Sequence, residues 1–76
     1  MSASTHYELN CEGQLCPMPV IKTQNKIKEL SAGDTLRVSC TDPGALQDIP
    51  TWCRINGHEV TSHEEQGRLI YISIRV

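Results

Sequence analysis

Hydrophobic and polar residues alternate along four short stretches of the chain. These stretches are residues 7–11, 36–40, 58–63 and 69–76. A period of two places successive side chains on opposite faces of a β-strand, so each stretch is expected to be a half-buried strand. The last is the clearest, because isoleucine occupies every second position from Ile70 to Ile74. The pattern predicts four strands, the last two joined by a turn over residues 64–68.

A helical period separates the first two strands. From Pro17 to about Leu30, hydrophobic residues recur at helical spacings. They are Val20, Ile21, Ile27 and Leu30. Ala-Gly-Asp at residues 32–34 is typical of a helix end, so we predict one helix over this stretch.

A second helix is predicted after the second strand. Asp42 suits the N-cap because its carboxylate accepts backbone N–H groups, and Pro43 suits the first helical position. The apolar face consists of Ala45, Leu46, Ile49, Trp52 and Cys53. Pro50 removes a helical hydrogen bond, which predicts a kink or two short segments. Asn-Gly at residues 56–57 is the expected stop.

The order of elements predicts an α/β two-layer sandwich with the topology βαβαββ. Two helices cover one face of a four-stranded mixed sheet. The first crossover is expected to be right-handed with parallel strands, and the last hairpin to be antiparallel. Because the sequence contains no linker or repeat, we expect residues 1–76 to form a single domain, with residues 1–5 disordered.

The motif Cys16-Pro17-Met18-Pro19 stands at the start of the first predicted helix. Proline is tolerated in a first helical turn, so Pro17 is expected at N1, Pro19 at N3 and Cys16 at the N-cap. A thiol there lies at the positive end of the helix dipole, which favours the nucleophilic thiolate. This placement indicates sulfur chemistry; the alternative is a buried cysteine that precedes a proline-started helix.

Composition narrows the classes of partner. The 76 residues include seven Lys and Arg against nine Asp and Glu, a formal net charge of −2. Direct nucleic-acid binding and a membrane partner are therefore not expected. Residues 1–6 lack the apolar core of a signal peptide, and no apolar run approaches the length of a membrane span. We expect a cytoplasmic protein with reduced cysteines.

The other three cysteines fall at positions typical of packing. Cys11 and Cys40 lie on inward strand faces, and Cys53 lies on the apolar face of the second helix, where a packed role is favoured over a functional one. A protective or resolving disulfide between Cys11 and Cys16 stays open. The cysteine spacings match no zinc pattern, so no metal or other cofactor is expected. Three residues are interpreted as solvated strand-edge histidines: His6, His58 and His63.

Taken together, the motifs resemble those of the TusA family, also called SirA-like sulfur-carrier proteins. The resemblance rests on Gly13, Cys16-Pro17-x-Pro19, Asp42-Pro43 and Asp48-Ile49-Pro50-x-Trp52-Cys53. These residues span nearly the whole chain. Cys-Pro-x-Pro alone is weakly specific, but its combination with the second-helix residues in so short a chain is much more so.

The resemblance implies a sulfurtransferase that carries sulfur as a persulfide on Cys16. Gly13, Pro17, Met18 and Pro19 would shape the site around that cysteine. It also implies a cysteine desulfurase or rhodanese-like protein as sulfur donor and a DsrE-like or other sulfur acceptor. Destinations in the family include tRNA thiolation, molybdenum cofactor synthesis and the oxidation of reduced sulfur compounds.

Two departures from the family pattern affect the expected site. Asn10 replaces the family's common Asp, which removes a charge near the helix start and favours a thiolate. Met18 stands where members that serve tRNA thiolation often have Glu, which suggests a different docking partner. Lys22 and Lys26 lie one turn apart on the same helix, either as a solvated face or as a surface for an acidic partner.

Two other classes of function remain as alternatives. A thiol redox module would use Cys11 with Cys16, because the chain has no Cys-x-x-Cys motif. A non-catalytic interaction or regulatory domain would not need the thiol, so it would keep its activity when Cys16 is replaced by Ser.

Overall fold

The computed structural model of the protein describes residues 5–15 and 17–76. Its elements are β1 (His6–Cys11), α1 (Met18–Ile27), β2 (Thr35–Cys40), α2 (Ala45–Ile55), β3 (Glu59–Gln66) and β4 (Leu69–Arg75). This order confirms the predicted topology βαβαββ. No helix within the described residues is long and apolar enough to cross a membrane.

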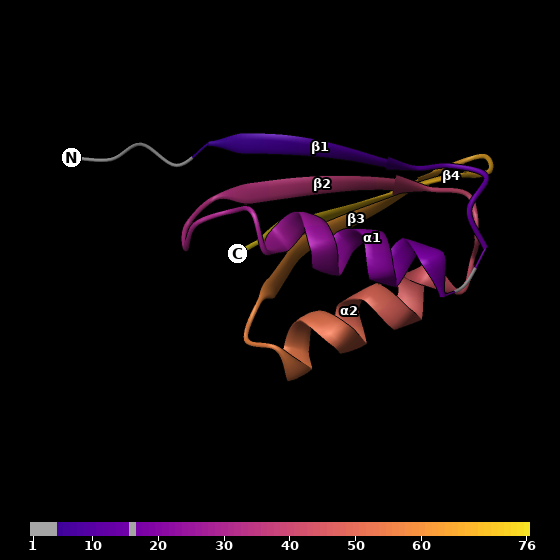
Figure 1. Ribbon diagram of the computed structural model, residues 1–76. Helices are drawn as coiled ribbons and strands as arrows, with labels where there is room; N and C mark the ends of the chain where they lie inside the picture. Colours follow the sequence, from indigo (N-terminus) through magenta and orange to yellow (C-terminus); the bar gives the residue numbers. More distant parts are fainter. Residues whose placement is uncertain (1–4, 16) are drawn as a thin grey trace.

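The four strands form one mixed sheet in the order β1-β2-β4-β3. β1 pairs with β2 in parallel, as predicted, while β4 is antiparallel to both β2 and β3. Both helices lie against the same face of this sheet, which makes a two-layer sandwich (Figure 1). The predicted fold class is therefore confirmed.

The hydrophobic core lies between the sheet and the two helices. Alternate residues of β2 and β4 are buried, as their period of two predicts. The fully or almost fully buried apolar residues are Cys11, Ile27, Leu36, Val38, Cys40, Ala45, Ile49, Cys53, Ile70, Ile72 and Ile74. Burial of each large aliphatic side chain contributes about 1.5–3 kcal/mol, so this layer supplies much of the stabilisation of the domain.

The predicted apolar face of α1 is partly wrong. The helix buries Pro19, Thr23 and Ile27, which are four residues apart, whereas Ile21 is 41% exposed. The hydrophobic period predicted a buried Ile21 because isoleucine is apolar. It did not predict a buried Thr23 because threonine is polar. The helix also ends at Ile27 rather than near Leu30, because the N–H groups of Glu29 and Leu30 bond to carbonyls only three residues back.

Two predicted features of α2 need correction. The helix is one continuous segment despite Pro50, so the alternative of two short segments is wrong. It begins at Ala45, because the N–H groups of Ala45 and Leu46 bond to carbonyls only three residues back. Asp42 nevertheless accepts a backbone N–H, from Gly44, at 3.1 Å.

The end of α2 is as predicted. Gly57 has φ +80°, and the N–H of His58 bonds to the carbonyl of Cys53 at 2.8 Å. This is the hydrogen bond of a Schellman motif, in which glycine takes the left-handed position at no steric cost. The helix stop at residues 56–57 is therefore confirmed.

Two ordered segments extend beyond their predicted limits. β3 continues to Gln66, so the hairpin turn is only Gly67-Arg68 and not residues 64–68. Thr5 was expected in a disordered tail, but its N–H donates to Asp34 Oδ1 at 3.1 Å and its carbonyl accepts the Thr35 N–H at 3.0 Å. The rest of that tail, residues 1–4, lies outside the described residues.

The topology brings three connections to one end of the sheet. Because β1 and β2 are parallel, the β1–α1 loop and the β2–α2 loop leave the sheet at the same end. The β3–β4 hairpin turns at that end as well (Figure 1). The described residues of the β1–α1 loop therefore lie among three loops, at the end of the sheet opposite the C-terminal end of β4.

Candidate functional site

The candidate site is the loop of residues 12–17 between β1 and α1, here called the cysteine loop. Cys16, the predicted catalytic residue, lies outside the described residues, but its neighbours are described. Gly13 has φ +77°, a conformation that favours glycine and explains its predicted site-shaping place. Its N–H donates to the Thr41 hydroxyl oxygen at 2.8 Å, which links the cysteine loop to the β2–α2 loop.

Local hydrogen bonds shape the rest of the cysteine loop. Asn10 Oδ1 accepts the Glu12 N–H at 2.8 Å, and the Cys11 carbonyl accepts the Gln14 N–H at 3.2 Å. These two contacts make short turns directly after β1. The uncharged Asn10 side chain, noted as a departure from the family pattern, thus supports the backbone at the base of the loop.

The helix start differs from prediction by one position. α1 begins at Met18, so Pro17 is the N-cap residue and not N1, and Pro19 is at N2 and not N3. The reason is a tight turn ahead of the helix, in which the Met18 N–H bonds to the Leu15 carbonyl at 2.9 Å. The predicted N-cap position of Cys16 is therefore wrong, because the cap falls on the next residue in the chain.

Exposed apolar residues lie close to position 16 along the chain. Leu15 is 75% exposed, and Met18 and Ile21 are each 41% exposed. Pro17 is exposed, whereas Pro19 is buried and anchors the first turn of α1 to the core. Exposed large apolar side chains are typical of contact surfaces, so Leu15, Met18 and Ile21, here called the apolar patch, are candidates for contact with a partner. The Leu15 member of the patch was missed from the sequence, although an apolar residue in a loop beside a cysteine is a usable signal.

Lys22 and Lys26 lie along β1 and are both half-buried. Lys22 Nζ donates to the Asn10 carbonyl at 3.1 Å, and Lys26 Nζ lies 5.2 Å from the centre of the Tyr7 ring. Both ammonium groups therefore have intramolecular contacts, and Lys22 braces the strand end from which the cysteine loop leaves. Partner binding by these two lysines stays a prediction.

The remaining cysteines are free thiols in the core. Cys11, Cys40 and Cys53 are fully buried, and Cys11 is the register partner of Cys40 across β1 and β2. Burial raises the pKa of the Cys40 thiol to about 12 and that of Cys53 to about 11. The pKa of Cys11 is also raised by burial, with a smaller opposing effect of the Lys22 charge. The packed interpretation is confirmed for all three, and Cys11 is a poor nucleophile for a redox pair.

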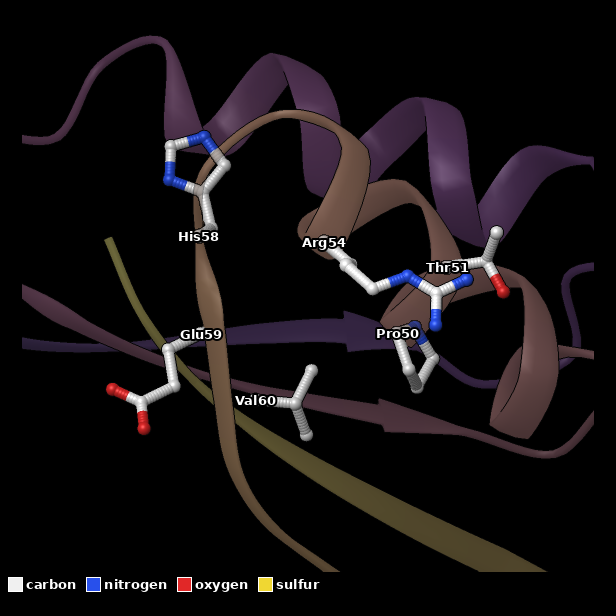
Figure 2. Close-up of a pocket in the computed structure, with 6 residues that line it drawn as sticks. All are labelled: Pro50, Thr51, Arg54, His58, Glu59 and Val60. Atoms are coloured by element: carbon white, nitrogen blue, oxygen red, sulfur yellow. The ribbon is translucent and has the colours of Figure 1, made fainter.

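A separate cavity of about 420 Å³ lies between α2 and the start of β3, away from the cysteine loop. Figure 2 shows that the Arg54 side chain extends toward Thr51, whereas the His58 ring and the Glu59 carboxylate point away from the Arg54 guanidinium. The ionisable groups do not converge on one point, so the cavity lacks the geometry of an acid–base site.

The histidines have structural surroundings. His58 is half-buried and stacks on Trp52 with ring centres 5.5 Å apart, so its solvated interpretation is wrong. The exposed His6 bonds to Thr35 and Glu8, and His63 is exposed as predicted. Within residues 5–15 and 17–76, no group of three His, Cys, Asp or Glu side chains lies close enough to hold a metal ion.

Comparison with solved structures defines the fold. The crystal structure of a SirA-like protein from Desulfitobacterium hafniense has a TM-score of 0.83, with 24% identity over 92% of this chain and 96% of that one. The fold is therefore that of the SirA-like α/β domains.

Sequence comparison then identifies the family. The family model of sulfurtransferase TusA matches residues 7–76. The sulfur carrier protein TusA of Pseudomonas aeruginosa is 40% identical over 72 residues, which cover 93% of this chain and 91% of that protein. YrkF of Bacillus subtilis is 37% identical over 62 residues, but the match spans only 34% of its length. The chain belongs to the TusA sulfurtransferase family.

Proposed function

We propose that Cys16 accepts sulfane sulfur as a persulfide and relays it to a partner protein. The observation that supports this most is the exposure of Leu15, Pro17 and Met18, the described residues that flank Cys16 in the chain, at the start of α1. A cysteine presented with them meets the two needs of a carrier, access for a donor and access for an acceptor.

The transfer consists of two thiol exchange steps. The Cys16 thiolate attacks the outer sulfur of a donor persulfide, the donor's S–S bond breaks, and the donor cysteine leaves as a thiolate. The transferred sulfur keeps its proton, so Cys16 becomes Cys–S–SH. An acceptor thiolate then attacks that outer sulfur and releases the Cys16 thiolate. Neither step needs an external oxidant or reductant.

The surroundings of α1 favour the anionic form of the sulfur. An anion at a helix N-terminus gains roughly 0.3–1 kcal/mol. The first turn of α1 contains no acidic residue that would offset this effect. The contribution is modest, so it favours the thiolate without ionising the thiol fully.

The partner is a protein with an apolar contact surface flanked by acidic residues. The apolar patch of Leu15, Met18 and Ile21 would pack against it beside the reacting sulfur, and Lys22 and Lys26 would face its acidic side. The donor in this proposal is a cysteine desulfurase or a rhodanese-like protein, and the acceptor is a DsrE-like or other sulfur-acceptor protein. The relay takes place in the cytoplasm and supplies tRNA thiolation, molybdenum cofactor synthesis or sulfur oxidation.

Intact-protein mass spectrometry tests the loading step. Reduced wild-type protein and Cys16→Ser are incubated with a cysteine desulfurase and cysteine, or with a rhodanese and thiosulfate. We expect a reducible adduct of about 32 Da, one sulfur atom, on wild type only. Cys53→Ser is the matched control, because it removes a buried thiol from α2 and should load normally. An equal adduct on Cys16→Ser would refute the proposal.

A further inference from the structure

Among the described residues, one hydrogen bond joins the cysteine loop to a distant part of the chain. The hydrogen bonds from Glu12 and Gln14 reach back only two or three residues, so they shape the turn without fixing its position against the sheet. The Gly13 N–H bond to the Thr41 hydroxyl, at 2.8 Å, spans 28 residues. It joins the loop to a residue outside its own turn.

Thr41 is well placed to serve as an anchor. It directly follows Cys40, the register partner of Cys11, so it stands beside the point where the cysteine loop leaves β1. The next residue, Asp42, accepts the Gly44 N–H at 3.1 Å, which fixes the turn that contains it. The anchor is therefore held by the sheet on one side and by the turn before α2 on the other.

We propose that Thr41 is a positioning residue for sulfur transfer. Its hydroxyl oxygen, by accepting the Gly13 N–H, holds the cysteine loop so that Cys16 stays near the N-terminus of α1. This inference rests on the proposed carrier function of Cys16, and it concerns where that thiol is held and not whether it carries sulfur.

Loss of the hydroxyl should leave the fold intact. Thr41 is half-buried and lines an open cavity of about 470 Å³ together with Pro43, Gly67 and Arg68. Water can therefore reach the Gly13 N–H when the hydroxyl is removed. Valine keeps the β-branched shape of threonine, so Thr41→Val removes the hydrogen bond to the Gly13 N–H with little change in packing. Thr41→Ser retains the hydroxyl and therefore the bond.

The test compares Thr41→Val and Thr41→Ser with Thr61→Val. Thr61 is a matched control because its hydroxyl donates to a backbone carbonyl, that of Ser73, from the exposed edge strand β3. Three quantities are measured: hydrogen exchange of the Gly13 amide by NMR, the pH profile of Cys16 alkylation by iodoacetamide, and the rate of sulfur loading from a rhodanese and thiosulfate. Thermal unfolding verifies that each variant is folded. If Thr41→Val does not fold, Thr41→Ala takes its place in the same three measurements.

In Thr41→Val we expect faster exchange at Gly13, an alkylation profile moved to higher pH, and sulfur loading slowed roughly two- to tenfold, as loss of one hydrogen bond predicts. Thr41→Ser and Thr61→Val should behave like wild type. If hydrogen exchange of the Gly13 amide is unchanged in Thr41→Val, the proposed anchoring hydrogen bond is refuted. If that exchange is faster but the pH profile of Cys16 alkylation is unchanged, Thr41 has only a structural role. Alkylation needs no persulfide, so a wild-type protein that failed to load sulfur would refute the carrier function separately.

Discussion

The two βα loops start alike and differ at the helix that each one meets. Each follows a strand that ends in a buried cysteine, Cys11 in one case and Cys40 in the other, and each contains proline. Before α2, Asp42 accepts a backbone N–H and Asp48 places a second carboxylate in the first turn. The first turn of α1 contains no acidic residue. The protein's own carboxylates thus offset the positive end of the α2 dipole, whereas no acidic residue in the first turn of α1 offsets the positive end that would favour the proposed Cys16 thiolate.

The largest expected effect concerns the buried thiols behind these loops. The Cys40 pKa is raised from 9.0 to about 12 in the folded protein. Its contribution to stability is therefore complete below pH 9.0 and is lost as pH rises toward about 12, because the unfolded chain ionises first. We expect the free energy of unfolding to fall by about 1.4 kcal/mol per pH unit for each such thiol.

Urea unfolding between pH 8 and pH 11 measures this loss. Cys40→Ala should be less stable at neutral pH because it leaves a cavity, but its stability should decline less steeply above pH 9. An equally steep decline in wild type and Cys40→Ala would show that this thiol is not protected in the folded state.

The next largest effect is expected from replacing a glycine in each of the two βα loops. Gly13→Ala places a side chain at φ +77°, which costs about 1–2 kcal/mol and distorts the cysteine loop. Gly44→Ala, at φ −60° with only ordinary contacts around the new Cβ, should change stability by less than about 1 kcal/mol. Thermal unfolding and sulfur loading check both variants. If sulfur loading slowed equally in Gly13→Ala and Gly44→Ala, the interpretation that Gly13 shapes the site and Gly44 does not would be contradicted.

A smaller effect is expected at the start of α2. Asp42→Ala removes the oxygen that accepts the Gly44 N–H and should lower the free energy of unfolding by roughly 0.5–1.5 kcal/mol, the contribution of one hydrogen bond. Asp42→Asn keeps a side-chain oxygen and should lose less. Sulfur loading, followed by mass spectrometry, should slow less than in Thr41→Val, because Asp42 acts on the cysteine loop only through the turn that contains Thr41. A loading defect as large as that of Thr41→Val would contradict this order.

The smallest effect tests the α1 dipole directly. Met18→Glu puts a carboxylate in the first turn of α1, which stabilises the helix but disfavours a neighbouring thiolate. We expect alkylation of Cys16 by iodoacetamide at neutral pH to slow by roughly two- to fivefold, the equivalent of 0.3–1 kcal/mol. Met18→Gln is the uncharged control and should react like wild type. Equal rates for the Glu and Gln variants would contradict the electrostatic argument.

Most of the fold was predictable because burial follows periodicity. The alternation in β2 and β4 corresponds residue by residue to their buried faces. Predictions failed where tertiary packing decides the outcome: a polar Thr23 fills the α1 face, and α2 continues through Pro50. The hairpin turn was placed too early because Glu64 and Glu65 are polar, yet their backbones pair fully with β4 on an exposed edge strand.

The site was predictable only in part. The motif located the cysteine loop, but a local turn moved the N-cap to Pro17, a shift of one residue that propensities do not resolve. The hydrogen bond between Gly13 and Thr41 was missed because it joins residues far apart in the sequence. Only the parallel pairing of β1 with β2 brings them together.

The central claim, that Cys16 passes sulfur on, is tested most directly by a relay measurement. Protein loaded from a rhodanese and thiosulfate is freed of donor and mixed with sulfur-free rhodanese, and the masses of both proteins are followed. We predict that about 32 Da, one sulfur atom, leaves the loaded protein and appears on the rhodanese, with no transfer from Cys16→Ser. Sulfur that stays on the loaded protein, or leaves it without appearing on the acceptor, would contradict the account.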